Sequence, residues 1–250
     1  MKGIKFTYKP FNTIIKVIFL SHLIFFFMCY DENVLKKRGG HLMKNILFLD
    51  PGHAFGLDNR TSPFMLENFT MIDQYAFAET DLAAFKAIVV HDFVDQIYME
   101  KHKEKIAAFL NEGKIVVWAG HLVTPWLPGC AIFTPKEIKK HTDYEISIVK
   151  EHPVFEGVNP DDMTYNKGVA GFFARGSHTP VPVDAEVLLS LPEDTPITYI
   201  DRTTTKGTIF VHSGRDLFAL RMQSKTTDRI STQLLQWIDD EYERLQGGTN

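Results

Sequence analysis

Residues 86–122 read KAIVVHDFVDQIYMEKHKEKIAAFLNEGKIVVWAGHL, and this stretch gives the clearest indication of the fold. Ala87–Val90 (AIVV) and Lys114–Trp118 (KIVVW) are short, continuous apolar runs, as buried parallel strands are. Between them, from Ile97 to Asn111, apolar residues recur at helical spacing, and Asp95 is placed to cap the start of that helix. A strand, a helix and a strand with such tight connections predict a right-handed crossover in a parallel sheet.

Further elements are predicted on both sides of this unit. Asn45–Leu49 (NILFL) stops at a turn sequence and predicts a first buried strand. Gly52–Asn68 is rich in Gly, Asn, Ser and Pro and has no sustained period, so it predicts a long loop with about one helical turn. Near the end of the chain, apolar residues from Ile230 to Leu245 lie on one side of a predicted helix.

After Pro125 the apolar runs become short and alternating, with Pro and Gly between them. This pattern predicts antiparallel strands added to the same sheet, at Tyr144–Val149, Gly168–Ala174, Val187–Leu191, Ile197–Ile200 and Thr208–His212. No linker is long enough to separate two domains. Residues 43–250 are therefore predicted to form one α/β domain, a mostly parallel sheet flanked by helices with antiparallel additions in the C-terminal half.

Charge is unevenly distributed along the 250 residues. The formal net charge is −4, but residues 1–42 carry seven Lys and Arg against two Asp and Glu, which leaves an excess of nine acidic residues over residues 43–250. Such a body repels phosphate backbones, so nucleic acid is not expected as a partner. The two cysteines, Cys29 and Cys130, cannot form a disulfide framework or a thiolate metal site.

Residues 1–42 are predicted to lie outside the domain. Residues 13–30 form an apolar run after basic residues, which is typical of a signal peptide or a short membrane anchor, but Lys16 and His22 interrupt it and no A-x-A cleavage site follows. Residues 36–40 (KKRGG) would be encoded by purine-rich codons that can contain a bacterial ribosome-binding site. We therefore favour translation from Met43 and a cytoplasmic protein; a membrane-anchored protein is the alternative.

Polar residues follow the predicted parallel strands, at the edge of the sheet where ligands bind in open α/β folds. Four of the ten histidines fall at these ends. Their grouping predicts a cleft, although strand ends also carry polar residues simply because they meet water. The candidates for acid–base catalysis are His121, His212 and Asp92. The candidates for ligand binding are Asp50, His53, His91, Gly120, Trp126 and Ser213.

Trp126 is included because Leu122–Cys130 (LVTPWLPGC) brings two prolines and a tryptophan directly after a predicted strand. This segment predicts a rigid wall or lid over the cleft. The alternative is that Trp126 packs into the core, as tryptophan usually does.

No cofactor can be named from the sequence. There is no H-E-x-x-H or H-x-H spacing, so no metal site is predicted, and any metal ligands would have to assemble from separate loops. The glycines do not form G-x-G-x-x-G or a P-loop, so nucleotide binding has no support.

The order of these elements resembles the class I glutamine amidotransferase-like superfamily, in which a strand, a helix and a second strand lead into a nucleophile elbow. Glu151–Val158 (EHPVFEGV) is similar to a segment of the ThuA-like branch, and so is Lys206–His212 (KGTIFVH) before a terminal helix. The resemblance covers most of residues 44–245 and implies a flavodoxin-like fold.

The chain departs from that family at the nucleophile. These enzymes carry a cysteine in G-x-C-x-G after the elbow strand, where a strained turn and backbone N–H groups activate a thiolate. Here residues 118–122 read WAGHL, so Ala119 or Gly120 stands at the nucleophile position. Cys130 lies beyond it in a Pro-Gly loop. Hydrolysis of glutamine by a Cys-His-Glu triad is therefore not expected.

Three functional hypotheses follow. The first is an amidotransferase-like domain without the nucleophile, which binds a small polar molecule or a protein partner at the strand ends. The second is a hydrolase or isomerase with His121 or His212 as general base, oriented by Asp92 or Asp50, with or without a metal. The third is a membrane-tethered form of either. We favour the first, because the missing nucleophile removes the mechanism that the fold would otherwise imply.

Overall fold

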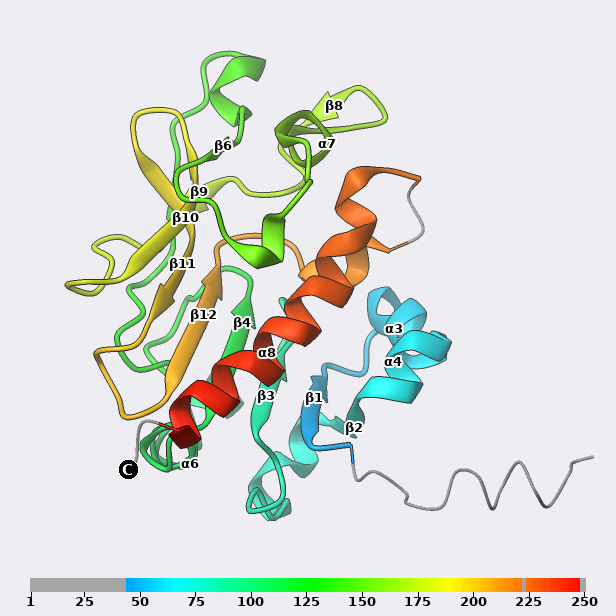
Figure 1. Cartoon of the computed structure of the whole chain (residues 1–250), viewed down its shortest axis with the longest axis vertical. Coiled ribbons are helices and arrows are strands. Elements are labelled where there is room, and N and C mark those ends of the chain that lie inside the picture. The colour runs from blue at the N-terminus through cyan, green and yellow to red at the C-terminus, as the bar shows by residue number, and fades with distance from the viewer. Residues whose placement is uncertain (1–43, 222–223, 248–250) are drawn as a thin grey trace, which may run out of the picture. The chain divides into compact units, whose positions relative to one another are not determined.

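A computed structural model describes residues 44–221 and 224–247. Its main sheet has the strand order β2-β1-β3-β4-β12-β11-β10-β6 (Figure 1). The parallel strands are β2 (Thr70–Asp73), β1 (Ile46–Asp50), β3 (Ala87–Val90), β4 (Ile115–Ala119) and β12 (Thr208–His212). The strands that continue the sheet by antiparallel pairing are β11 (Thr195–Asp201), β10 (Glu186–Leu191) and β6 (Ser147–Ile148).

The predicted α/β class is confirmed, with a mostly parallel sheet and antiparallel strands in the C-terminal half. The five parallel strands follow the 2-1-3-4-5 order of a flavodoxin-like sheet. One prediction was wrong in orientation. Thr208–His212 is not an antiparallel addition; it is β12, which pairs in parallel with β4 and lies near the middle of the sheet.

Successive residues of each strand point to opposite faces of the sheet, and each face carries its own apolar core. On one face, residues such as Phe48, Val117 and Phe210 pack with Leu234 and Trp237 of helix α8 (Ile230–Gly247), which crosses that face in Figure 1. Residues of the other face pack with helices α5 (Gln96–Lys101) and α6 (Lys103–Asn111). Burial of both faces explains why the central strands read as continuous apolar runs.

The predicted helix from Ile97 to Asn111 is divided in two at His102, whose backbone leaves the helical region (φ −115°, ψ 17°). Asp95 caps the first part as expected, and its carboxylate accepts hydrogen bonds from the backbone N–H groups of Ile97 and Tyr98. Ile97 is 66% exposed, so it does not belong to the buried stripe.

Residues 52–68 are more helical than predicted. They form η1 (Ala54–Gly56), α3 (Leu57–Thr61) and α4 (Pro63–Asn68). These helices are short and lack a sustained apolar period, which is why the sequence pattern missed them. A tertiary contact holds α3, because its Arg60 guanidinium bonds both carboxylate oxygens of Asp50 at 3.0 Å.

The remaining elements are short. Two small sheets pair β5 (Thr134–Pro135) with β9 (Gly176–Ser177) and β7 (Tyr165–Asn166) with β8 (Val169–Ala170). The predicted strand at Gly168–Ala174 is thus reduced to β8. The other helical turns are η2 (Gln74–Glu79), η3 (His141–Tyr144), η4 (Pro153–Phe155), α7 (Pro160–Thr164), η5 (Leu217–Leu220) and η6 (Thr226–Arg229).

Among the residues described, no helix combines the length and the apolar character needed to cross a bilayer. The leader predicted at residues 1–42 and the candidate anchor at residues 13–30 lie outside the described residues.

Candidate functional site

A pocket of about 720 Å³ lies at the carboxyl ends of the parallel strands. Its walls come from the segments that follow β3, β4 and β12, from the helical segment after β1 and from residues 171–175. Four of the predicted site residues line it: His91, Asp92, Gly120 and His121. The pocket therefore lies where the sequence predicted a cleft, because the ends of neighbouring parallel strands meet at one edge of the sheet.

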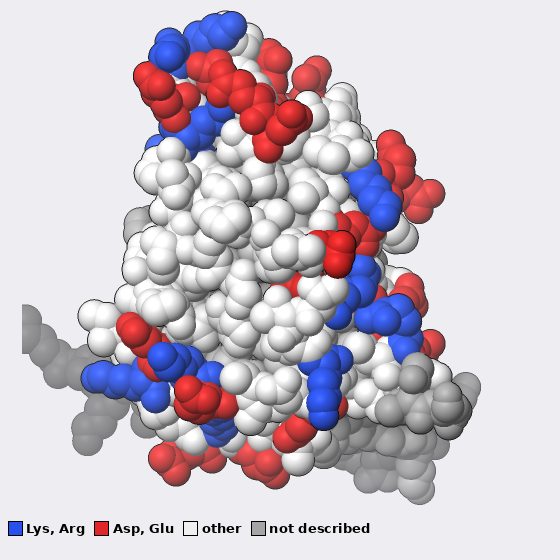
Figure 2. Space-filling view, turned by 90° about the vertical axis from the view of Figure 1, so that its left-hand side faces the viewer, with Lys and Arg blue, Asp and Glu red and all other residues white. Residues whose placement is uncertain are grey.

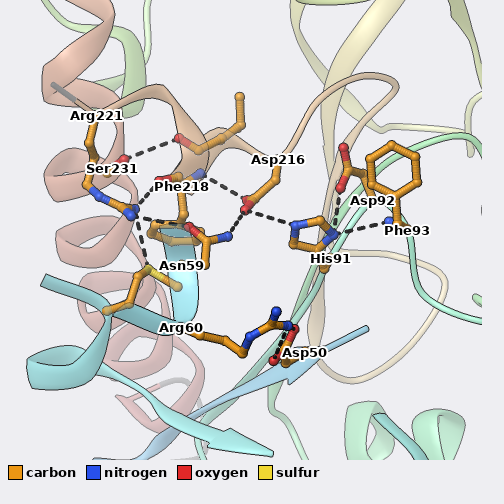
Figure 3. A network of polar contacts seen from close by, with 12 residues as sticks. Asp50, Asn59, Arg60, His91, Asp92, Phe93, Asp216, Phe218, Arg221 and Ser231 are labelled. Carbon is orange, nitrogen blue, oxygen red and sulfur yellow. Dashed lines mark hydrogen bonds and ion pairs between the residues drawn. The ribbon is translucent and has the colours of Figure 1, made fainter. Parts of the chain in front are cut away.

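His91 is buried at the end of β3 and lies between two carboxylates (Figure 3). Its Nδ1 is 2.6 Å from Asp92 Oδ1, and its Nε2 is 3.9 Å from Asp216 Oδ2. Burial acts to lower the pKa of His91, but Asp92, Asp216 and Asp50 together outweigh it, so the pKa is raised. The ring is thereby biased toward the protonated form.

The Nδ1 atom of His91 has two partners that require opposite protonation states. The backbone N–H of Phe93 points at this nitrogen at 3.2 Å, which requires an unprotonated acceptor. The Asp92 carboxylate is its partner when the nitrogen carries a proton. Nδ1 therefore has a partner in either protonation state: the Phe93 N–H donates to it when it is unprotonated, and the Asp92 carboxylate is its ion-pair partner when it is protonated.

Asp216 was not predicted as a site residue; it is buried and links His91 to Asn59 and Phe218 in the network of Figure 3. Its carboxylate accepts hydrogen bonds from Asn59 Nδ2 (2.8 Å) and from the backbone N–H of Phe218 (2.9 Å). Burial raises the pKa of Asp216, opposed by the charge of His91. Behind it, Arg221 bonds the side-chain oxygen of Asn59 at 3.2 Å, which fixes the amide with its nitrogen toward Asp216.

Asp50 and His53 lie beside the pocket rather than in its lining. Asp50 is bound by Arg60 and also accepts the backbone N–H of Gly52 at 3.0 Å, so it closes the turn after β1. The ring of His53 lies edge to face with the rings of His91 and Phe93, at centroid distances of 5.5 and 5.0 Å. His53 thus supports residues that line the pocket.

His121 lies at the rim of the pocket. Its ring stacks on the ring of Phe133, with 3.8 Å between the two ring centroids. Partial burial lowers its pKa, and the positive charge of Arg175 adds to this effect, against the opposing charge of Asp92. His121 is therefore biased toward the neutral form, which is the form that accepts a proton or a hydrogen bond at neutral pH.

His212 and Ser213 were predicted as site residues, but both are fully buried and do not line the pocket. His212 Nδ1 lies 2.8 Å from the Thr198 hydroxyl, and its Nε2 lies 3.2 Å from the Phe173 carbonyl oxygen. Burial lowers the pKa of His212 to about 4. The Ser213 hydroxyl donates to the Ile197 carbonyl oxygen at 3.0 Å. We assign both residues to the core, since their polar atoms are already bonded within it.

Trp126 also belongs to the core. Its side chain is 1% exposed and packs edge to face on Trp118 at 5.1 Å. The alternative stated from sequence is the correct one, and the wall of the pocket opposite Gly120 is formed by residues 171–175 instead.

Gly120 leaves no room for a side chain. Its φ is +141°, and a Cβ atom there would lie 2.7 Å from the Trp118 ring and 3.0 Å from Asp92 Cα. Trp118 is itself fully buried and cannot give way. Gly120, one of the two residues expected at a nucleophile position from the sequence, is therefore closed to any side chain in this structure.

Residues 171–175 form a wall that is tied to the segment after β12. The Phe173 carbonyl accepts from the backbone N–H of Arg215, and Ala174 forms a β-bridge with Gly214. A Cβ atom on Gly214 would lie 1.9 Å from the Phe173 oxygen, so only glycine permits this approach. No sequence signal pointed to this wall, because it reaches the pocket through a long excursion between β6 and β10.

Within residues 44–221 and 224–247, no group of three or more His, Cys, Asp or Glu side chains is arranged to hold a metal ion.

Comparisons with known proteins do not name a family. No protein-family model matches the chain, and no curated protein sequence matches it. Among solved structures, the chain is similar to "Cytoplasmic Protein STM1381 from Salmonella typhimurium LT2", with a TM-score of 0.44 and 13% sequence identity over 78% of this chain and 98% of that one.

Proposed function

We propose that this protein is a glutamine amidotransferase-like domain that has no nucleophile and binds a small polar molecule non-covalently at the strand ends. The observation that carries the proposal is the closed position at Gly120, next to a pocket of about 720 Å³. Among the described residues that line this pocket there is no Cys, Ser, Thr or Lys. A covalent intermediate on a thiol, an aliphatic hydroxyl or an amine therefore has no side chain to begin from in this pocket.

Cys130 does not replace the missing nucleophile. Its side chain is buried outside the pocket, and burial raises its pKa to about 12. A thiol in this state is protonated at neutral pH and unreactive.

The family label in this proposal rests on two features. The parallel strand order and the placement of Gly120 directly after β4 agree with the arrangement expected of a nucleophile elbow. The ThuA-like branch is proposed on the two short segments described above, at residues 151–158 and 206–212.

A small molecule remains the favoured partner over nucleic acid. On the face shown in Figure 2, Lys and Arg side chains lie intermingled with Asp and Glu at the two ends and along the right-hand edge, and the centre is largely uncharged. A continuous basic surface, which nucleic acid binding requires, is absent from the described part of that face. A protein partner is the second outcome of the test below.

One observation favours an acid–base enzyme as the second candidate. Asp92, His91 and Asp216 form a chain of titratable groups from the pocket into the core, and His121 adds a neutral imidazole at the rim. Such groups can move a proton without a covalent intermediate, as an isomerase or a hydrolase acting through water requires.

The test is binding at the pocket, measured by thermal unfolding against panels of small polar molecules and divalent metals. At a hundredfold excess over the dissociation constant, a ligand is expected to raise the melting temperature by roughly 5–10 °C. His121→Ala and Asp92→Ala are expected to remove the shift, and His141→Ala, an exposed histidine outside the pocket, is expected to keep it.

Three results would count against the proposal. Ligand shifts that are equal in His121→Ala and in the unchanged protein place binding elsewhere. No shift at all, with one protein recovered stoichiometrically by pull-down, identifies an interaction module. Turnover of a bound ligand that is lost in Asp92→Ala identifies the acid–base enzyme.

A further inference from the structure

The mouth of the pocket carries two exposed aromatic side chains. Phe93 is 58% exposed and Phe172 is 48% exposed, and both line the pocket. Phe173, the next residue along, is buried instead, with its ring edge to face with His212. Exposed phenylalanines that gather around a pocket are unusual on a monomer surface and mark a place where apolar surface is covered on binding.

The Phe93 ring and the backbone that carries Phe172 are both held by contacts within the protein. Phe172 belongs to the wall that is tied to Gly214 and Arg215 by backbone contacts of its neighbours Phe173 and Ala174. Phe93 packs at right angles (89°) against the His53 ring. Preorganised aromatic surfaces favour a flat ring over a flexible chain, because stacking on them costs little ordering entropy.

The charged groups around the pocket divide between its floor and its rim. At the floor, the His91 ring lies between the carboxylates of Asp92 and Asp216. At the rim, Arg175 and Arg215 stand against a single carboxylate, Asp58.

Neither arginine is paired with a carboxylate among the described residues. The Arg175 Nε donates to the Gly171 carbonyl oxygen at 2.7 Å, which aims the guanidinium while leaving its terminal nitrogens available. Arg215 is exposed, and its side chain makes no hydrogen bond or ion pair to a residue that the structure describes. Two guanidinium groups without protein carboxylate partners are suited to an acidic group on a ligand.

We propose that the ligand combines a planar ring with an acidic group: the ring packs against Phe93 and Phe172, and the acid binds Arg215 and Arg175. This inference rests on the proposed function, because it uses the same pocket. It narrows the ligand from any small polar molecule to aromatic or heterocyclic acids.

The test compares three probes by isothermal titration calorimetry. Indole-3-carboxylate is planar and acidic, indole-3-carboxamide is planar and neutral, and cyclohexanecarboxylate is acidic and not planar. We expect the planar acid to bind about tenfold tighter than either of the others, which corresponds to the usual strength of one aromatic contact or one charged hydrogen bond. Phe172→Leu is expected to reduce the preference for the planar acid over cyclohexanecarboxylate. Arg215→Gln is expected to reduce its preference over the carboxamide.

Lys103→Gln is the matched control, because it removes one positive charge from an exposed position on α6, outside the pocket. It is expected to leave all three affinities unchanged. If cyclohexanecarboxylate or the carboxamide binds in the pocket as tightly as the planar acid, the inference is overturned and the proposed function stands. If no probe binds and the broad panel also gives no pocket-dependent shift, both fail.

Discussion

Asp216 and His91 come from distant parts of the chain and meet at the floor of the pocket, with Asp216 Oδ2 3.9 Å from His91 Nε2. Since Asp92 faces the other ring nitrogen, the imidazole lies between two carboxylates. Burial alone would keep a histidine neutral, so its protonation here depends on these neighbours. The protonation state of His91 is therefore a property of the tertiary structure, set by residues from β3 and from the segment after β12.

Replacing Asp216 by Asn is expected to lower the pKa of His91. The change removes a negative charge that favours the imidazolium and keeps an acceptor for the Phe218 N–H. The measurement is a pH titration of the histidine ring signals by NMR. Asp58→Asn is the control, because this exposed carboxylate at the rim does not act on His91. An unchanged or raised pKa in Asp216→Asn would show that the two residues are not coupled.

Stability is expected to fall as the pH falls below about 6.5, the ordinary pKa of histidine. His178 and His212 are fully buried, and burial lowers their pKa values to about 3 and about 4. In that window the unfolded chain binds protons that the folded chain does not bind. Each of these residues then costs about 1.4 kcal/mol of unfolding free energy per pH unit, until the pH reaches its folded pKa. The contribution of His91, whose pKa is raised, is fully present below pH 6.5 and is lost only as the pH rises above that value, so it does not offset this fall.

Urea unfolding at pH 7, 6 and 5 measures this dependence. His178→Gln is expected to reduce the slope of the unfolding free energy against pH by the equivalent of about one bound proton. The reason is that the change removes one buried group that is protonated only in the unfolded chain. His141→Gln, at an exposed position, is expected to leave the slope unchanged. A His178→Gln slope equal to that of the unchanged protein would mean that His178 is protonated in the folded state.

Much of the fold was predictable because it depends on local patterns. β3 and β12 were bounded correctly, since the apolar residues of each stop at polar neighbours or at the strand end, although the parallel pairing of β12 was not predicted. β2 was missed because it is a short edge strand that is only partly buried. The helices in residues 52–68 were missed because the Arg60–Asp50 contact, rather than an apolar period, holds that region.

The site was predictable only where it follows a strand directly. His91, Asp92, Gly120 and His121 were found in this way, whereas His212 was misplaced because the sequence does not show that Thr198 and the Phe173 carbonyl occupy both ring nitrogens. Asp216 and Arg215 were missed because they lie two to three residues after Ser213, the last residue that was predicted to belong to the site after this strand. Phe172 and Arg175 carried no signal, because their wall is placed by the tertiary structure.

Cys130 is expected to resist alkylation in the folded protein. Its side chain is 9% exposed and its thiol has a pKa of about 12, so almost no thiolate forms at pH 7.5. The measurement is iodoacetamide labelling followed by mass spectrometry of the peptide that contains Cys130, so that Cys29 is counted separately. Labelling is expected only after denaturation. Rapid labelling of the native protein would reopen the question of a thiol-based activity.

Gly120→Ala is expected to destabilise the fold by about 2–4 kcal/mol, the sum of backbone strain and overpacking. Its new Cβ would meet the buried Trp118 ring at 2.7 Å and the Asp92 backbone at 3.0 Å, and neither can move without disturbing the sheet or the pocket. Ligand binding is expected to weaken as well, because Asp92 lines the pocket.

Gly113→Ala separates the two causes. Gly113 also has a positive φ (+75°), but no atom lies within 4 Å of a Cβ built there, so only backbone strain of about 1 kcal/mol is expected. Chemical denaturation measures the unfolding free energies of the two variants. Titration with a pocket ligand measures the loss of affinity expected for Gly120→Ala. A Gly120→Ala protein as stable as the Gly113→Ala protein would show that Gly120 does accept a side chain. In that case the nearby Trp118 ring and Asp92 backbone would not require glycine at this position, and the proposed function would lose the observation that carries it.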